Sequence, residues 1–240
     1  MKIEITWTPA QLKTVSTANE ENTIAVVVDV LRATTCMACA LYNGAEVVIP
    51  AYSHDEARQL RLCYPGALLC GEVNHLKPQD FDLGNSPKDF TSRAVKNRTL
   101  IHASSNGTKA IVAIFAAGVK KIYTGCFAQL SVLTEALEHD LKEKFPSKLL
   151  LAAAGSQDGA SYEDLLFISC LLYRLGMKHP VISLWRACDP KRLFEHLSMS
   201  KNGRALVKKG LVADVLFAAS IDTCPVLTRV CEKGFVVAWK

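Results

Sequence analysis

The clearest change from hydrophobic to polar positions comes near the start of the chain. The run Ile24–Val28 is apolar and rich in β-branched residues, which is typical of a strand covered on both faces. After a short polar turn the sequence predicts a helix over Cys36–Asn43, with Thr34 or Thr35 as its N-cap and Gly44 at its end. A buried strand followed by a helix is the repeating unit of α/β folds.

The same alternation recurs along most of the chain. Further strands are predicted at Met1–Trp7, Glu46–Pro50, Ala67–Gly71, Arg98–Ala103, Lys120–Thr124 and Lys148–Ala154. Helices are predicted over residues 53–64, 109–117, 128–139 and 161–175, and a short helix is predicted to open at Pro9. The helices at 53 and 161 begin with the spacing of a capping box. This order predicts a mainly parallel, mixed β-sheet with helices on both faces, in a three-layer α/β/α fold.

The last third of the chain has a less regular pattern. Helices are predicted over Pro190–Leu197, Lys201–Lys209 and Leu211–Ser220, and a closing hairpin is predicted from Val226–Val230 and Phe235–Trp239. With 240 residues, half of them apolar, the chain is long enough to bury a sizeable core. We expect residues 1–240 to form a single α/β domain, and the alternative is a subdivision near 187–190.

Composition and charge narrow the function classes. The 28 Lys and Arg residues and 23 Asp and Glu residues give a net charge of +5, which is spread along the chain without a basic block. We therefore expect no nucleic-acid binding. We expect no membrane span, because no apolar run reaches ~18 residues, and no signal peptide, because the N-terminus lacks an apolar core. Nine cysteines, several within apolar elements, favour a reducing cytoplasmic location over a disulfide framework.

Charged and polar residues follow several of the predicted strands. Asp29 and Arg32 follow the run Ile24–Val28, while Glu72 and the turn Ser104–Thr108 follow later strands. In open α/β sheets, ligands bind at the carboxyl ends of the strands, and a helix start there offers N–H groups to an anion. Asp29 can therefore hold a divalent cation and Arg32 can clamp a phosphate or sulfonate. The alternative is a partly buried ion pair of these two residues without chemistry.

The segment 72–91 has no hydrophobic period and contains two prolines. A loop of this length in a compact domain is usually functional or disordered. It includes the run Phe81–Pro87, in which Asn85 and Ser86 are short hydrogen-bonding residues held by the following proline. Asp82 is interpreted either as a turn former or as a carboxylate behind the site.

Two of these features also have ordinary structural interpretations. The turn Ser104–Thr108 either presents backbone N–H groups to an anion or is a simple connection between a strand and a helix. Asp164 either caps its helix by binding the Ser161 backbone N–H or belongs to the site, and Glu163 either favours the helix dipole or binds a ligand.

A metal site is predicted from the same carboxylates. Mg²⁺ takes oxygen ligands and is usually held by one or two carboxylates together with water and substrate phosphate. Asp29 with Glu72 or Glu163 meets that need, and no histidine–cysteine spacing typical of zinc occurs.

The sequence Cys36-Met-Ala-Cys39 has the spacing of a redox-active cysteine pair near a helix start. No tryptophan precedes it, no proline lies within it, and other thiols are scattered along the chain. We interpret the two cysteines as small side chains that pack a helix on the sheet, with thiol–disulfide exchange as the alternative.

Together these motifs resemble those of the 2-phosphosulfolactate phosphatase family of the coenzyme M pathway. The resemblance spans roughly residues 24–225 and rests on Val28–Thr35, Gly71-Glu72, Phe81–Pro87, Ser105–Thr108 and Glu163-Asp164. It implies an α/β fold, dependence on Mg²⁺ and hydrolysis of a phosphate monoester of a small sulfonated hydroxy acid. The chain departs from the family pattern at Val73-Asn74-His75, at the serines before Asn106, and at Asn202-Gly203, where the family tends to have His-Gly.

From the residues and the resemblance we expect a Mg²⁺-dependent phosphatase. Asp29 is expected to bind the metal or to attack phosphorus. Glu72 and Glu163 are expected to complete the metal site, with a role as general base as the alternative for Glu72. Arg32 is expected to bind phosphate oxygens. Substrate-binding residues are expected at Thr34, Thr35, Asn85, Ser86, Ser105, Asn106, Gly107 and Thr108. The expected partner is a small phosphate ester, with a homodimer as the default assembly. The alternative function is a non-catalytic binder of a small phosphorylated or sulfonated acid.

Overall fold

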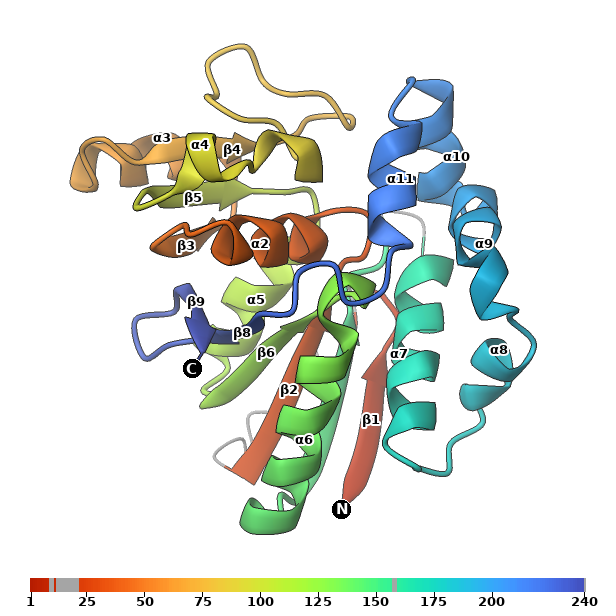
Figure 1. Cartoon of the computed structure of the whole chain (residues 1–240). Coiled ribbons are helices and arrows are strands. Elements are labelled where there is room, and N and C mark those ends of the chain that lie inside the picture. The colour runs from red at the N-terminus through yellow and green to blue at the C-terminus, as the bar shows by residue number, and fades with distance from the viewer. Residues whose placement is uncertain (9–10, 12–21, 157–158, 240) are drawn as a thin grey trace.

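The structure, a computed structural model, describes residues 1–8, 11, 22–156 and 159–239 (Figure 1). Its strands are β1 (Lys2–Thr6), β2 (Thr23–Val28), β3 (Val47–Ala51), β4 (Leu68–Gly71), β5 (Thr99–Ala103), β6 (Lys121–Gly125), β7 (Lys148–Ala153), β8 (Leu227–Val230) and β9 (Val236–Trp239). Its helices are α2 (Ala33–Tyr42), α3 (His54–Cys63), α4 (Ser92–Val95), α5 (Gly107–Ala116), α6 (Leu130–Lys144), α7 (Tyr162–Arg174), α8 (Ile182–Arg186), α9 (Leu193–Met199), α10 (Lys201–Lys208) and α11 (Val212–Ala218). The short helix predicted to open at Pro9 lies outside the described residues.

All nine strands form one mixed sheet in the order β1-β7-β2-β6-β8-β9-β3-β5-β4. The group β1-β7-β2-β6 and the group β3-β5-β4 are each parallel. The predicted C-terminal hairpin is confirmed as β8 and β9, which pair antiparallel with each other. This hairpin lies in the middle of the sheet, because β8 pairs antiparallel with β6 and β9 with β3. The last strands of the chain therefore join the two parallel groups.

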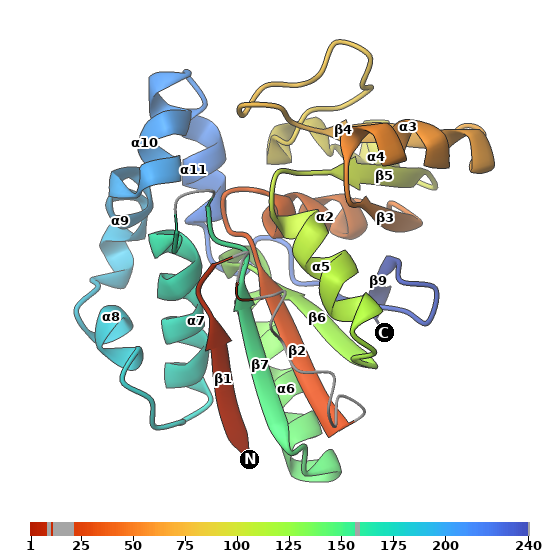
Figure 2. The ribbon, with the colours of Figure 1, turned by 180° about the vertical axis from the view of Figure 1, so that it is seen from behind.

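The residues of β2 confirm a strand buried on both faces. Ile24, Val26 and Val28 pack in an apolar cluster with residues of α6 and α7. Ala25 and Val27 point the other way, into a cluster with residues of α2 and α5. In agreement, α6 lies in front of the sheet in Figure 1, and α5 lies in front of it in the reverse view of Figure 2. The predicted three-layer arrangement is thus the observed one.

The C-terminal helices extend the layer that contains α7. Apolar residues of α8, α9, α10 and α11 belong to the same cluster as α7. In Figures 1 and 2, α8 and α9 lie on the outer side of α7, and α10 and α11 lie above it. This cluster takes in residues on both sides of 187–190, where the sequence would permit a subdivision. Within the described part of the chain, no helix is both long enough and apolar enough to cross a membrane.

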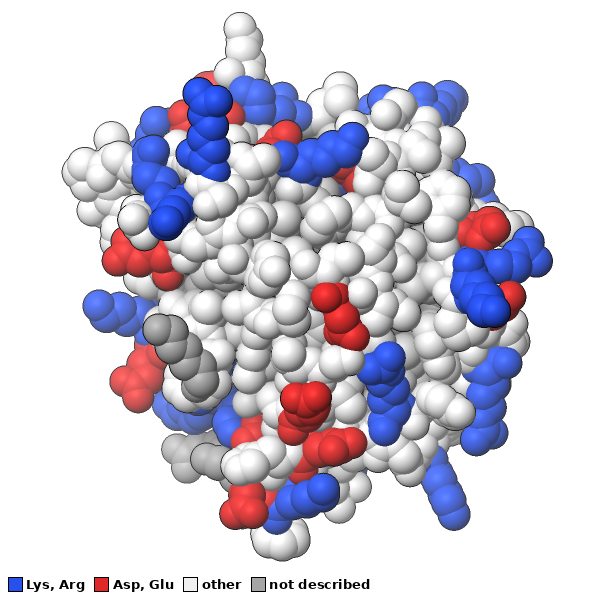
Figure 3. All heavy atoms as spheres, viewed as in Figure 1, with Lys and Arg blue, Asp and Glu red and all other residues white. Residues whose placement is uncertain are grey.

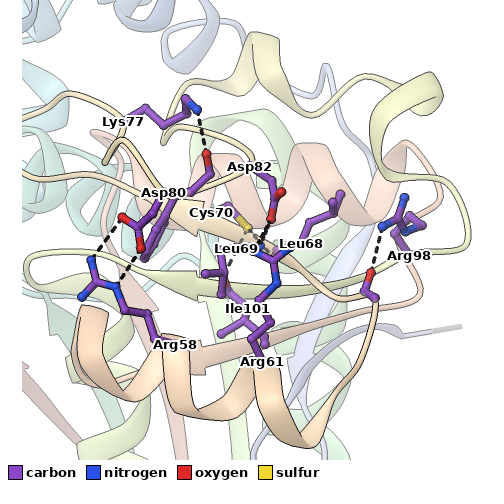
Figure 4. A network of polar contacts seen from close by, with 12 residues as sticks. Arg58, Arg61, Leu68, Leu69, Cys70, Lys77, Asp80, Asp82, Arg98 and Ile101 are labelled. Atoms are coloured by element: carbon purple, nitrogen blue, oxygen red, sulfur yellow. Dashed lines mark hydrogen bonds and ion pairs between the residues drawn. The ribbon is translucent and has the colours of Figure 1, made fainter.

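The long loop after β4 is fastened at its base to α3 and β4 (Figure 4). Arg58 of α3 binds the carboxylate of Asp80, with Nε at 2.8 Å from Oδ2. Asp82 accepts a hydrogen bond of 2.8 Å from the backbone N–H of Leu69 and forms an ion pair with Arg61 at 3.1 Å. Asp82 therefore fixes the loop to the edge of the sheet.

Charged side chains on the face seen in Figure 1 lie mainly around its edge (Figure 3). Lys and Arg residues are interspersed there with Asp and Glu residues, a few charged side chains of both signs lie in the centre and lower middle of the face, and its upper middle is largely uncharged. The net positive charge is therefore dispersed on this face, as the sequence predicts.

Candidate active site

A cavity of about 60 Å³ lies where β2, β4, β5 and β7 reach their carboxyl ends. Its wall includes Asp29 after β2, Glu72 after β4, Ser105 and Asn106 after β5, and Gly155 after β7. Because these strands are parallel within their groups, side chains far apart in sequence meet at one rim. The structure thus brings together the main strand-end residues that the sequence singles out.

Asp29 lies in an environment that is poorly suited to a negative charge. Burial and, to a smaller extent, the nearby charges of Glu72 and Glu163 raise its pKa from 3.8 to about 7. Backbone N–H groups of Ala33 and Gly107 donate to the carboxylate and moderate this rise. Gly107 is required here, because a Cβ at that position would collide with the carboxylate of Asp29. The role of Gly107 in binding substrate stays a prediction, and what the structure shows is that this glycine allows α5 to approach Asp29 closely.

Glu72 is held by neutral donors. Its Oε1 accepts from the hydroxyl of Ser105 at 2.6 Å and from the Ser105 backbone N–H at 3.1 Å. Its Oε2 accepts from the backbone N–H of His75 at 2.7 Å. Burial alone would raise the pKa of Glu72, but these hydrogen bonds lower it below its usual value. Glu72 therefore stays ionised while it ties the turn after β5 to the long loop.

Arg32 lines the cavity but already has an ionic partner. Its Nη1 donates to Oδ2 of Asp214 on α11 at 2.6 Å, and its Nη2 donates to the carbonyl oxygen of His75 at 2.8 Å. The alternative of an Arg32–Asp29 ion pair does not occur; the buried partner of Arg32 is Asp214.

The hydroxyl groups of Thr34 and Thr35 do not line the cavity. The Thr34 hydroxyl lies 2.8 Å from the carbonyl oxygens of Asp29 and Gly125 and shares its one proton between them. The Thr35 hydroxyl donates to the carbonyl oxygen of Val30. The prediction that either threonine caps the helix is wrong, because α2 begins at Ala33 and both threonines lie in its first turn. There they bond back to the preceding strand end and fix the backbone around Asp29.

Three other predicted substrate-binding residues also have internal partners. Asn85 lines the cavity and accepts a 3.0 Å hydrogen bond from Nε2 of His102, whose pKa burial lowers to about 4, so that the ring is neutral. Ser86 donates to Oδ1 of Asp214 at 2.6 Å. Thr108 bonds to Ser104 within the turn. Of these three, the structure places only Asn85 in the wall of the cavity.

Glu163 and Asp164 open α7 and are both buried. The capping-box prediction for Asp164 is wrong. Its carboxylate accepts from the backbone N–H of Val30 at 2.8 Å and of Gly155 at 3.3 Å, and so joins the ends of β2 and β7. Glu163 accepts a 2.7 Å hydrogen bond from the amide of Asn202, a cavity residue on α10.

Acidic side chains are in excess at this site. None of the ion pairs among the described residues involves Asp29, Glu72 or Glu163, and the charge of Arg32 is already balanced by Asp214. Burial and the charges of Asp29 and Glu163 raise the pKa of Asp164 well above its usual value. In the described part of the chain no group of at least three His, Cys, Asp or Glu side chains is arranged as a ready-made metal cage. The residues nevertheless fit Mg²⁺ in its usual mode, in which one or two carboxylates act together with water and phosphate.

The family model described as 2-phosphosulpholactate phosphatase matches residues 8–233 of the chain. The chain belongs to this family. A protein of Thermotoga maritima named probable 2-phosphosulfolactate phosphatase is 37% identical over 214 residues, covering 85% of this chain and 89% of that protein. Proteins of the same name from Symbiobacterium thermophilum and Carboxydothermus hydrogenoformans are 34% and 31% identical, and cover 89% and 95% of this chain and 93% and 92% of their own. The resemblance noted in the sequence is confirmed.

The side chains of Cys36 and Cys39 lie in an apolar environment, as expected for residues that pack a helix on the sheet. Both side chains are buried in the cluster that joins α2 to the sheet. Burial raises the pKa of Cys36, and contact with Cys224 together with burial raises the pKa of Cys39. Thiols of raised pKa are poor nucleophiles, so the packing interpretation is the better supported one.

Sequence reasoning missed two side chains that the C-terminal helices bring to the site. Asp214 lies within a predicted helix and has no neighbouring motif, so no sequence signal pointed to it. Asn202 stood out only as a departure from the family pattern, and it proves to be the partner of Glu163.

Proposed function

We propose that the protein hydrolyses a phosphate monoester of a small anionic hydroxy acid in a Mg²⁺-dependent reaction. Its proposed substrate is (R)-2-phospho-3-sulfolactate, which gives 3-sulfolactate and phosphate, as in coenzyme M biosynthesis. The observation that carries the proposal is the meeting of Asp29, Glu72 and Arg32 at one polar cavity in a member of this family.

The excess of carboxylates supports the need for a cation. A pocket lined by Asp29 and Glu72, with Glu163 behind, repels a dianionic ester, since Arg32 is already paired with Asp214. Asp29 together with Glu72 or Glu163 would hold Mg²⁺. Bound there, Mg²⁺ would offset the charge of the phosphate and polarise its P–O bonds.

The protein's own residues then act mainly by position. Arg32 offers its remaining N–H groups to phosphate oxygens, and Ser105 and Asn106 add short polar groups to the wall of the same cavity. The lowered pKa of Glu72 makes it a poor proton acceptor near neutral pH, so its proposed role is to hold that turn and the metal. Asp29, which lines the same cavity, is the better candidate for moving a proton or attacking phosphorus.

An assay with 2-phosphosulfolactate and a generic phosphate ester tests the proposal. We expect phosphate release with Mg²⁺ and its loss when a chelator is added, with restoration by excess Mg²⁺. The non-catalytic alternative predicts binding of the ester without release of phosphate. Turnover that is unaffected by chelator would contradict the metal dependence.

A further inference from the structure

One buried carboxylate joins Arg32 to two other parts of the molecule. Asp214 on α11 accepts from Nη1 of Arg32 through Oδ2 and from the hydroxyl of Ser86 through Oδ1, both at 2.6 Å. The side chains of Arg32 and Asp214 are 2% and 1% exposed. Helix α11 and the loop after β4, which contains Ser86, lie side by side in both views of the fold (Figures 1 and 2). Asp214 thus connects the C-terminal helices, the long loop and the strand end that carries Arg32.

The guanidinium of Arg32 is held from two sides. Besides the Nη1 bond to Asp214, its Nη2 donates to the carbonyl oxygen of His75 at 2.8 Å. A guanidinium is planar and its N–H directions are fixed, so partners at two different nitrogens define the plane of the group. Arg32 lines the cavity, and its other N–H groups are the ones that could meet a ligand there. The direction in which Arg32 offers them is therefore determined by Asp214 together with the His75 carbonyl, and Asp214 is the partner that carries a charge.

The main consequence of this ion pair is geometric. A fully buried pair adds little net stability, because the loss of hydration offsets the attraction between the charges. Here the pair also leaves Arg32 with little net charge, so its contribution to anion binding depends on the direction of its hydrogen bonds. An arginine of this kind is effective only while its partner keeps it in place.

We propose that Asp214 is a positioning residue for phosphate: it holds the guanidinium of Arg32 at the cavity wall and fastens the Ser86 segment beside it. This inference rests on the proposed function, in which Arg32 contacts the phosphate group. It assigns part of substrate recognition to α11, although no atom of Asp214 lines the cavity.

A double-mutant cycle between Asp214 and Arg32 tests the proposal. In D214N we expect binding of inorganic phosphate, measured by calorimetry with Mg²⁺, and kcat/KM for a phosphate ester to fall about 10- to 100-fold, the usual scale for supporting residues. D214E, which keeps the charge, should recover part of the loss. R32Q should lose at least as much phosphate binding as D214N, and R32Q/D214N should lose no more than R32Q alone, because Asp214 acts only through Arg32.

The melting temperature should follow a different order. The double variant should be more stable than either single variant, because each single variant leaves one buried charge unpaired and the double variant leaves none.

Asp140 provides the matched control. It is also a buried acid that accepts from Lys121 at 2.5 Å and from Tyr123 at 2.7 Å, but it lies on α6 outside the cavity wall. D140N should lower the melting temperature and leave phosphate binding unchanged.

Each outcome of the cycle decides the proposal. Phosphate binding by D214N within about twofold of wild type, losses that multiply in the double variant, an equal loss in D140N, or absence of phosphate binding in the wild type would each overturn it. If the cycle behaves as expected for phosphate binding but no ester is turned over, the proposed function fails and the positioning role stands. If esters are hydrolysed at the wild-type rate by D214N, the positioning role fails and the proposed function stands.

Discussion

Residues 22–175 and residues 176–239 contribute to the same cavity in different ways. The first region supplies Asp29, Glu72 and Ser105 directly from strand ends. The second supplies Asn202 and Asp214 from helices, and these two side chains bind Glu163 and Arg32 of the first region. The same second region also inserts β8 and β9 between the two parallel groups of the sheet. The first region carries the proposed reactive groups, and the second binds two side chains of the first, Arg32 and Glu163.

The difference follows from how each side chain is placed. A residue that follows a parallel strand is carried to the rim of the sheet by the strand itself, whatever its position in the sequence. A residue on a docked helix reaches the site only if the helix packs in one particular orientation. The apolar cluster that binds α8–α11 to α7 is therefore part of what defines the site.

The largest effect is expected from removal of the Asp29 carboxylate, which the first region places at the end of β2. We expect D29N to lower kcat for a phosphate ester about 100-fold or more, the scale for loss of one electrostatic contact at a reacting group. Because Asp29 is a buried charge near Glu72 and Glu163, the same substitution should leave the metal-free protein at least as stable as wild type at pH 8. Near-normal turnover in a folded D29N protein would remove Asp29 from the chemistry.

A smaller effect is expected when a supporting contact from the second region is cut. N202A removes the 2.7 Å hydrogen bond to Glu163, and we expect activity and Mg²⁺ affinity to fall about 10-fold. N43A is the matched control, since Asn43 is also half-buried and donates to a carbonyl oxygen, that of Phe90, outside the cavity. Equal activities of N202A and N43A would mean that the second region contributes only to folding.

The fold and the strand-end residues were predictable from the sequence because both depend on short-range patterns. The apolar run at Ile24–Val28 specifies a buried strand, and the alternation with helices specifies a mostly parallel sheet. From there the meeting of Asp29, Glu72 and Ser105 follows from the rule for strand ends. The central position of β8 and β9 did not follow, because the pairing partners of a hairpin are set by the whole sheet.

The two capping errors have one physical cause. Thr34, Thr35 and Asp164 are residue types that often bond to the start of their own helix, and sequence spacing favoured that assignment. In the folded chain the carbonyl oxygens and N–H groups of neighbouring strand ends compete for the same side chains. The N–H of Val30 and the carbonyl oxygen of Gly125 are two such groups, and neither can be identified as a neighbour from local sequence.

A further expected effect is a dependence of stability on pH that originates in buried carboxylates of the first region. The pKa of Asp29 is raised from 3.8 to about 7, so between these values the folded protein keeps a proton that the unfolded chain has released. This contribution to the free energy of unfolding is fully present below pH 3.8 and is lost as the pH rises to about 7, at no more than about 1.4 kcal/mol per pH unit for one proton. Asp164, whose pKa is also raised, acts with the same sign.

Denaturant unfolding in chelator between pH 5 and pH 8 is compared for wild type and D29N, because the lowered pKa of His102 adds a slope of opposite sign below pH 6.5 in both proteins. The loss of stability with rising pH should be smaller in D29N than in wild type, and the part that comes from Asp164 should remain. D55N, which removes the same charge from a side chain that is 88% exposed on α3, should leave the slope as in wild type. If D29N and D55N give the same slope as wild type, the carboxylates at this rim do not repel one another. The case for a cation between them would then lose its electrostatic basis, while the positioning contacts from α10 and α11 would be unaffected.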